Sequence, residues 1–321
     1  MSKACVYGLI FLAVVASTSA ARADFILGGQ GYPCYLERVS ATGADLGPYA
    51  VVGDDLLHNM IVDRSGHVVC VGGYSITVLQ PPNQLYTFDV SHLIGGAGNI
   101  VEAWDGRLLV PTHISPFGSG STGVVEFNPQ NLNFVQNLLP ISASTIEFNS
   151  QIPGDATTRG GALYVGTDAG TTLRYRMTTG GTLLQDPSFA LPVVGKMHTQ
   201  TGSGNLFLEN APNTISRYDS EGSLLGTVFS MPGVFVDDFN VGDNGSFYVL
   251  GGTQTQYPQI YQLAPDGSSL GAPLDLSNAG GAARFADRIV FIPAPEPTSL
   301  LLLMPAVILL IGKTKRPHFG L

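Results

Sequence analysis

Short apolar runs of four or five residues recur along most of the chain, and polar turns separate them. Six segments share one form, in which a turn rich in Asp, Ser or Gly precedes an apolar or β-branched run. They are DRSGHVVCVGG from Asp63, AWDGRLLVPTH from Ala103, TRGGALYVGTD from Thr158, QTGSGNLFLEN from Gln200, VGDNGSFYVLGG from Val241 and ARFADRIVFIP from Ala283. The segment ADFILGGQ, from Ala23, has the same form. Runs of this length and chemistry predict β-strands.

The spacing of these segments predicts how the strands are organised. Successive turn glycines lie 40, 55, 43 and 41 residues apart, and Asp287 follows 42 residues after the last of them; the glycines are Gly66, Gly106, Gly161, Gly204 and Gly245. A strand repeat near 40 residues is typical of β-propeller blades. We therefore expect an all-β fold, with a β-propeller over residues 24–293. The preferred count is six blades, with the partial copies at the two ends of the body together forming one blade that closes the ring. The alternatives are seven blades or an irregular β-sandwich.

The segment VDDFNVGDNGSFYVLGG, from Val236, is the clearest copy of the repeat. It resembles the repeats of NHL-type and lactonase-type β-propellers, in which Asp-x-x-Gly precedes an apolar strand. The resemblance extends over most of the body of the chain, but it is generic. It implies the fold and says little about chemistry, because one fold carries many functions.

The first 23 residues have the form of a secretory signal peptide. One early cation, Lys3, precedes an apolar run from Ala4 to Ala16, and small residues follow that run. Ala21 and Ala23 flank Arg22 in the small-x-small pattern of a cleavage site, so we expect signal peptidase to cut after Ala23. Because the apolar run is short for a membrane span, we expect cleavage rather than permanent insertion.

Residues 294–321 form a second terminal segment of distinct composition. Pro295, Glu296 and Pro297 precede an apolar run from Leu300 to Gly312, and the basic residues Lys313, Lys315 and Arg316 follow it. This order resembles the PEP-CTERM sorting signal of bacterial exported proteins. The resemblance implies recognition by an exosortase, a membrane-embedded processing enzyme that acts near the Pro-Glu-Pro.

Physical arguments support this interpretation of the C-terminal segment. A proline extends the residue before it, so Glu296 is presented on an extended stalk. The basic residues are expected to stay on the cytoplasmic side as a membrane stop. The apolar run has 13 residues and contains Pro305, so as a helix it would cover about 20 Å of a ~30 Å hydrocarbon core. We expect a short transmembrane helix that holds the precursor transiently in the inner membrane before release to the cell surface or extracellular space.

Charge and cysteine content narrow the function classes. The body from Asp24 to Pro293 contains 10 basic and 23 acidic residues, which disfavours nucleic acid as a partner. Removal of the signal peptide leaves two cysteines, Cys34 and Cys70. Exported proteins can form disulfides, but nothing in the sequence predicts that these two are close, and two unpaired thiols is the preferred interpretation.

The sequence contains no recognisable catalytic motif, and we assign no catalytic residue. Counting back six to eight positions from each turn glycine gives His58, Asn59, Asn99, Asp155, His198, Asp237 and Asp238. Residues at this offset are expected to line one end of the channel, as in the Asn/Asp ring that holds a divalent cation in lactonase-type propellers. Asn99, Asp155 and Asp238 are therefore predicted metal ligands, and their oxygens would suit Ca²⁺. The alternative is that such residues serve only turns and loops.

Three functions remain open from the sequence. The first is a non-enzymatic exported propeller, delivered to the cell surface or extracellular matrix by C-terminal processing. The second is a lactonase-like or lyase propeller enzyme that depends on a divalent cation. The third is a polysaccharide-binding module; for that function Trp104 is the single tryptophan, but its place in a repeat segment predicts packing rather than binding.

Overall fold

The computed structural model describes residues 24–29, 34–52, 57–73, 75–80, 84–89, 98–112, 123–242, 245–253, 255–277, 279 and 283–292. Within this range, Phe25–Phe291 forms one compact unit. The predictions made for Ala23, for Pro295 to Pro297 and for the basic tail fall outside the described residues. No helix in the described part has both the length and the hydropathy needed to cross a membrane.

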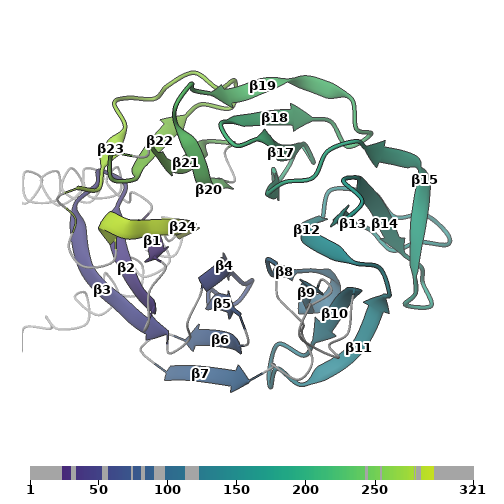
Figure 1. Cartoon of the computed structure of the whole chain (residues 1–321). Helices are drawn as coiled ribbons and strands as arrows, with labels where there is room; N and C mark the ends of the chain where they lie inside the picture. The colour runs from purple at the N-terminus through teal and green to yellow at the C-terminus, as the bar shows by residue number, and fades with distance from the viewer. Residues whose placement is uncertain are drawn as a thin grey trace, which may run out of the picture. The chain divides into compact units, whose positions relative to one another are not determined.

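The compact unit is a six-bladed β-propeller, and each blade is a four-stranded antiparallel sheet (Figure 1). Blade 1 consists of β24 (Ala286–Ile292), β1 (Asp24–Gly29), β2 (Cys34–Ser40) and β3 (Asp45–Val52). Blade 2 consists of β4 (Leu57–Val62), β5 (Val68–Gly72), β6 (Ser75–Gln80) and β7 (Gln84–Asp89). Blade 3 consists of β8 (Val101–Glu102), β9 (Leu108–Thr112), β10 (Gly123–Phe127) and β11 (Phe134–Leu139).

The other three blades follow in chain order. Blade 4 consists of β12 (Ala143–Asn149), β13 (Ala162–Thr167), β14 (Thr172–Met177) and β15 (Leu183–Leu191). Blade 5 consists of β16 (Met197–Thr199), β17 (Leu206–Ala211), β18 (Thr214–Tyr218) and β19 (Leu224–Ser230). Blade 6 consists of β20 (Phe235–Val241), β21 (Phe247–Gly252), β22 (Gln259–Leu263) and β23 (Leu274–Asp275). The six blades confirm the fold class and the preferred blade count.

Two strands from opposite ends of the chain close the ring. The innermost strand of blade 1, β24, pairs with β1, so the last strand completes the sheet that the first strand began. The repeat segment at Ala283 is therefore the first strand of a blade, whereas the other repeat segments are second strands. The six second strands are β1, β5, β9, β13, β17 and β21. The similar apolar pattern of β24 is what left seven blades open as an alternative.

The hydrophobic core lies in the seams between neighbouring blades. Between blades 2 and 3, the buried residues Val69, Val71 and Ile76 pack in one cluster with Leu108 and Val110. Similar clusters fill the seams between blades 3 and 4, 4 and 5, 5 and 6, and 6 and 1. The second strands are apolar on both faces because both neighbouring blades cover them, and β5 is buried at all five positions. Each such side chain contributes roughly 1.5–3 kcal/mol on burial.

Short polar turns connect the first and second strands of most blades. In blade 2, Asp63 Oδ1 accepts hydrogen bonds from the backbone N–H groups of Ser65 (2.9 Å) and His67 (2.8 Å). Gly66 has a φ of +79°, which an L-residue seldom adopts. The Asp and Gly of the repeat are thus required by the turn itself.

Trp104 is buried in the seam between blades 3 and 4. Its Nε1–H donates to the Gly160 carbonyl at 2.7 Å, and its ring lies edge-on to Phe148 with centroids 4.7 Å apart. A Cβ at Gly161 would approach the Phe148 ring to 2.5 Å, so glycine is required at that position. The prediction that Trp104 serves packing is confirmed.

Cys34 and Cys70 are both buried free thiols, in blades 1 and 2. Burial raises the pKa of Cys34 to about 11. Burial, and then the charge of Cys34, raise the pKa of Cys70, so the two thiols lie near enough to interact electrostatically. Both cysteines stay protonated near neutral pH, as expected for small apolar core residues.

Candidate functional site

The innermost strands carry a ring of polar side chains that ties each blade to the next. An innermost strand is a sheet edge, so its outward backbone groups have no partner strand. Buried backbone groups of this kind require hydrogen-bond partners. In this propeller, the partners are side chains from the neighbouring innermost strand.

In three of the six seams the acceptor is the short side chain of an Asn or Asp in, or just before, the innermost strand. Asn59 Oδ1 accepts from the Ile100 N–H at 3.3 Å, which joins blade 2 to blade 3. Asn99 joins blade 3 to blade 4 with two bonds, because it accepts from the Ile146 N–H at 2.8 Å and donates to the Ile146 carbonyl. Asp238 Oδ2 accepts from the Ile289 N–H at 3.0 Å, which joins blade 6 to blade 1.

Longer side chains serve the other three seams. Glu147 Oε1 accepts from the N–H (2.8 Å) and the hydroxyl (2.9 Å) of Thr199, which joins blade 4 to blade 5. Lys196 Nζ donates to the Val236 carbonyl at 3.3 Å, between blades 5 and 6. Arg288 Nε donates to the His58 carbonyl, between blades 1 and 2. We call the six residues the seam ring; its members are Asn59, Asn99, Glu147, Lys196, Asp238 and Arg288.

The predicted metal ligands do not come together. Asn99 lies just before β8 and Asp238 in the middle of β20, and both are bonded to backbone groups across a seam. Asp155 lies after the end of β12, at the opposite end of the innermost strands. No group of three or more His, Cys, Asp or Glu residues is arranged to hold a metal ion within the described part of the chain. A metal role for Asn99 and Asp238 remains a prediction.

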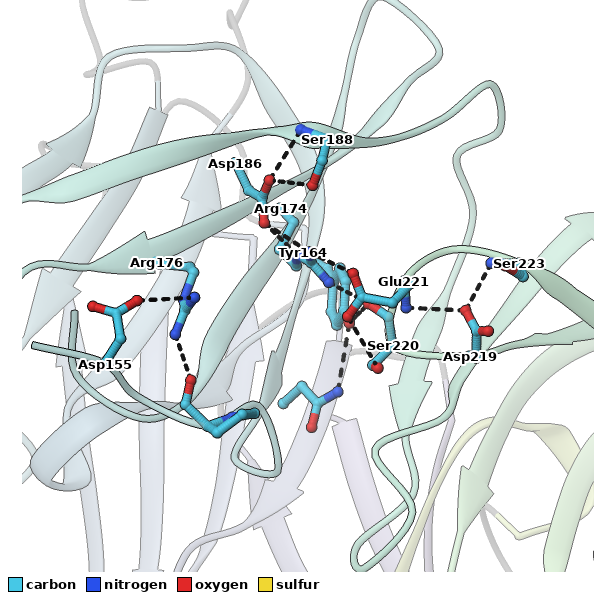
Figure 2. Close-up of polar contacts among 12 residues, drawn as sticks. Asp155, Tyr164, Arg174, Arg176, Asp186, Ser188, Asp219, Ser220, Glu221 and Ser223 are labelled. Carbon is cyan, nitrogen blue, oxygen red and sulfur yellow. Dashed lines mark hydrogen bonds and ion pairs between the residues drawn. The ribbon is translucent and has the colours of Figure 1, made fainter. Parts of the chain in front are cut away.

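Placing Asp155 at the start of a strand was wrong because the offset from the turn glycine is not constant. Five residues separate β4 from β5, whereas twelve separate β12 from β13. Asp155 is exposed in this longer loop, where its Oδ1 accepts from the Thr157 N–H at 2.7 Å. Its Oδ2 lies 3.4 Å from Arg176 (Figure 2). Bonds from Thr157 and Thr158 lower the pKa of Asp155, which is the expected effect of holding the ionised form in a turn.

Charged side chains gather where blades 5, 6 and 1 meet the channel. Lys196 Nζ lies 3.5 Å from Glu209, and Arg288 Nη1 lies 3.4 Å from Asp287. Burial raises the pKa of Asp237 to about 6, although Lys196 opposes that rise. Two cations therefore lie among three carboxyl groups here, and the raised pKa of Asp237 brings its protonation closer to the neutral range.

His198 lies beside this charged cluster. Burial lowers its pKa, Asp238 acts in the opposite direction, and Lys196 lowers it further. Its ring is edge-on to Phe239, with centroids 4.9 Å apart. The lowered pKa keeps the imidazole neutral near neutral pH, and a neutral imidazole can accept a proton. The offset count had selected His198 and Asp237, but it missed Lys196, Glu209 and Arg288, whose sequence contexts carry no motif.

A second polar cluster lies outside the channel, between blades 4 and 5 (Figure 2). Arg174 is 4% exposed, and its guanidinium binds Asp186 (2.6 Å), Glu221 (3.2 Å) and the Ser220 carbonyl. Burial opposes ionisation of Asp186, but bonds from Ser188 and Arg174 outweigh it and lower the pKa of Asp186 to about 2. Because Glu221 and Ser220 belong to the turn between β18 and β19, Arg174 holds the two blades together.

Comparison with known proteins identifies the fold. Neither the family models nor the curated proteins compared with the chain give a match. Among solved structures, a protein of unknown function from Bacteroides caccae is 12% identical with a TM-score of 0.58, over 84% of this chain and 99% of that one. A streptogramin B lyase is 17% identical with a TM-score of 0.50, over 77% and 81%. A gluconolactonase from Xanthomonas campestris is 16% identical with a TM-score of 0.49, over 73% and 89%.

These likenesses define the class of protein by its fold alone: a β-propeller, in agreement with the six four-stranded blades. At identities of this level, the likeness extends to the fold alone. The function must therefore be argued from the residues of this chain.

Proposed function

We propose that this chain is an exported, non-enzymatic β-propeller protein, sent to the cell surface or extracellular matrix by exosortase-type processing of its C-terminal segment. Signal peptidase would remove residues 1–23, and the short apolar helix would hold the precursor in the inner membrane until processing. The order of Pro295-Glu296-Pro297, apolar run and basic tail supports this proposal.

One structural observation carries the proposal. The strand that closes the ring, β24, ends at Ile292, three residues before Pro295. The 24 strands of the described residues thus all precede the sorting segment, and cutting near the Pro-Glu-Pro would release a propeller with each of these strands in place. Cleavage before or within β24 would instead remove the strand that closes the ring.

The seam ring supports a non-enzymatic role. Its six polar side chains point to backbone groups of the neighbouring blade, so the polar groups near the channel serve assembly. A ligand that displaced the seam bond of Asn99 or Asp238 would leave a buried backbone N–H unsatisfied at a cost of about 1–3 kcal/mol, so these side chains are held in their seam positions.

Changing Pro295, Glu296 and Pro297 together to alanine tests the sorting proposal. In a host that contains an exosortase, the wild-type chain should be shortened and released, whereas the triple variant should stay at precursor length in the membrane fraction. The exposed Pro232 provides a matched control, and Pro232→Ala should be processed like the wild type. Normal processing of the triple variant would refute the proposal.

The charged cluster around Asp237 favours a second candidate function, a cation-dependent lactone hydrolase or lyase. Asp237, with its pKa raised to about 6, and the neutral His198 are suited to proton transfer. Metal analysis of the purified chain and a lactone-hydrolysis assay before and after chelation distinguish the two. Bound Ca²⁺ together with chelator-sensitive hydrolysis would favour the enzyme, and the lack of both would eliminate it.

A further inference from the structure

Exposed aromatic side chains gather on blades 6 and 1 at the channel. Among the described residues, five Phe or Tyr side chains are strongly exposed, and three of them belong to this region. They are Phe235 (43% exposed), Tyr257 (39%) and Phe285 (59%). Most of the other exposed large side chains are aliphatic residues, such as Leu184 and Leu224 on outer strands.

The topology brings these three aromatic residues to the same end of the blades. Phe235 is the first residue of β20, and Phe285 directly precedes β24, so both lie where an innermost strand begins. Tyr257 lies in the connection between β21 and β22, which in an antiparallel sheet reaches the edge where the first strand starts. β20 and β24 are the innermost strands of adjacent blades (Figure 1), and the bond from Ile289 to Asp238 joins them.

An arginine holds two of the rings in fixed positions. The rings of Tyr257 and Phe285 meet edge-on, with centroids 5.8 Å apart. The Arg284 guanidinium lies 4.9 Å from the Tyr257 ring centre and 5.3 Å from that of Phe285, and it donates to the Tyr257 hydroxyl at 2.7 Å. The surface is therefore built before any ligand arrives, which reduces the entropy lost on binding.

Carboxyl groups follow the aromatic residues at the same spacing in both strands. β20 begins Phe235-Val236-Asp237, and the chain enters β24 as Phe285-Ala286-Asp287. Asp237 is half-buried, and burial, with a contribution from the charge of Asp287, raises its pKa. Both carboxylate oxygens of Asp287 are buried, so Asp237 is the member of the pair that is offered to a ligand.

We propose that this aromatic rim, made of Phe235, Tyr257, Arg284 and Phe285 with Asp237, binds a neutral hexose polysaccharide. A pyranose ring has C–H groups on its faces and hydroxyls around its edge. The exposed rings would cover the C–H faces, while the carboxyl and guanidinium groups would bond the hydroxyls. The acidic character of the chain, with a net charge of -9, disfavours anionic polymers, and the positive charge of Arg284 within the rim disfavours cationic ones.

The rim also differs from the site that the sequence suggested for a saccharide. Trp104 is buried and hydrogen-bonded between two blades, so its indole presents no free face. The proposal gives the exported propeller a binding partner. It rests on the proposed function in one respect only: export would bring the protein to the place where the polysaccharide lies. Binding is measured without any processing step, so failure of one proposal is distinguishable from failure of the other.

Affinity electrophoresis of the purified full chain tests the rim. The gels contain a neutral glucan, a neutral galactomannan or, as the polyanionic comparison, alginate. At least one neutral polymer should retard the wild type, and alginate should not. Phe235→Ala and Phe285→Ala should each weaken retardation about tenfold in dissociation constant, the loss expected for one aromatic contact.

Leu184→Ala, which truncates an exposed residue on β15 in blade 4, is the matched control and should bind like the wild type. Urea unfolding of each variant confirms that the fold is retained. Failure of both neutral polymers to retard the wild type would overturn the proposal. So would wild-type binding by the two phenylalanine variants, or stronger retardation by alginate than by the neutral polymers.

Discussion

Glu147 should make the propeller less stable as the pH rises. Its carboxyl group accepts two hydrogen bonds from Thr199 across the seam between blades 4 and 5. Burial raises the pKa of Glu147 to about 8, although the bonds from Thr199 oppose that rise. The change Glu147→Gln keeps the side-chain size and an oxygen acceptor for Thr199, and it removes the ionisation.

The magnitude follows from linkage between proton binding and folding. An ordinary Glu has a pKa near 4.5, so between that value and about 8 the folded chain binds one proton more than the unfolded chain. Stability from this group is complete below about pH 4.5 and is lost as the pH rises through about 8, at up to about 1.4 kcal/mol per pH unit. Between about pH 6 and pH 8, this amounts to about 2 kcal/mol. Asp237, with a pKa of about 6, acts in the same direction but mainly below pH 6.

Urea unfolding at the two pH values, followed by fluorescence, measures this effect. Trp104 is the single tryptophan and packs against Phe148, the neighbour of Glu147 in β12, so its emission reports on this part of the ring. The wild type should lose about 2 kcal/mol of unfolding free energy between pH 6 and 8, and Glu147→Gln should not. Asp155→Asn is the control, since this exposed carboxyl has a lowered pKa and is ionised at both values. Equal losses in the wild type and Glu147→Gln would refute the reasoning.

Three further predictions concern the seams and the N-terminus. Arg174→Ala should cost about 3 kcal/mol in urea unfolding because it leaves the largely buried Asp186 carboxylate without its cation. Arg176→Ala, which breaks a more exposed pair, should cost about 1 kcal/mol or less, and equal losses would contradict the role of Arg174 in joining blades 4 and 5. Gly161→Ala should clearly lower the melting temperature, because the added Cβ would meet the Phe148 ring. Gly170 has a similar φ of +81° but open space around it, so Gly170→Ala should lower the free energy of unfolding by only about 1 kcal/mol. N-terminal sequencing of the exported protein should begin at Asp24, and a different first residue would move the cleavage site.

The sequence predicted the strands and blades well because local chemistry specifies them. Asp63 and Gly66 are needed by a turn that involves only its own few residues, so the turn is visible in the sequence. The fully buried second strands likewise reveal themselves as unbroken apolar runs, as in β5. The role of β24 was harder to assign, because its apolar pattern matches a second strand and only its pairing with β1 makes it the first.

The candidate site was less predictable because its contacts cross between blades. The predicted position of Asp155 was wrong because the loop between β12 and β13 is longer than the loops in other blades, and a periodic pattern does not indicate loop length. Lys196 and Arg288 each bind a backbone carbonyl of the next blade, and nothing in their own segments indicates that partner. The exposure of Phe235 and Phe285 likewise depends on where the blades end, so apolar residues that look like core in the sequence lie on the surface.

Joining β24 to β1 also dictates when the molecule can finish folding. Blades 2 to 6 contain strands that follow one another along the chain, so each can form soon after it is synthesised or translocated. Blade 1 must wait, with three strands in place, until the segment at Ala286 arrives. Because loop closure over so long a chain is slow, this step should limit the folding rate. A chain that stalls before residue 286 would carry an open edge on β1 for as long as it survives, and that edge is the part of the molecule most in need of protection during folding.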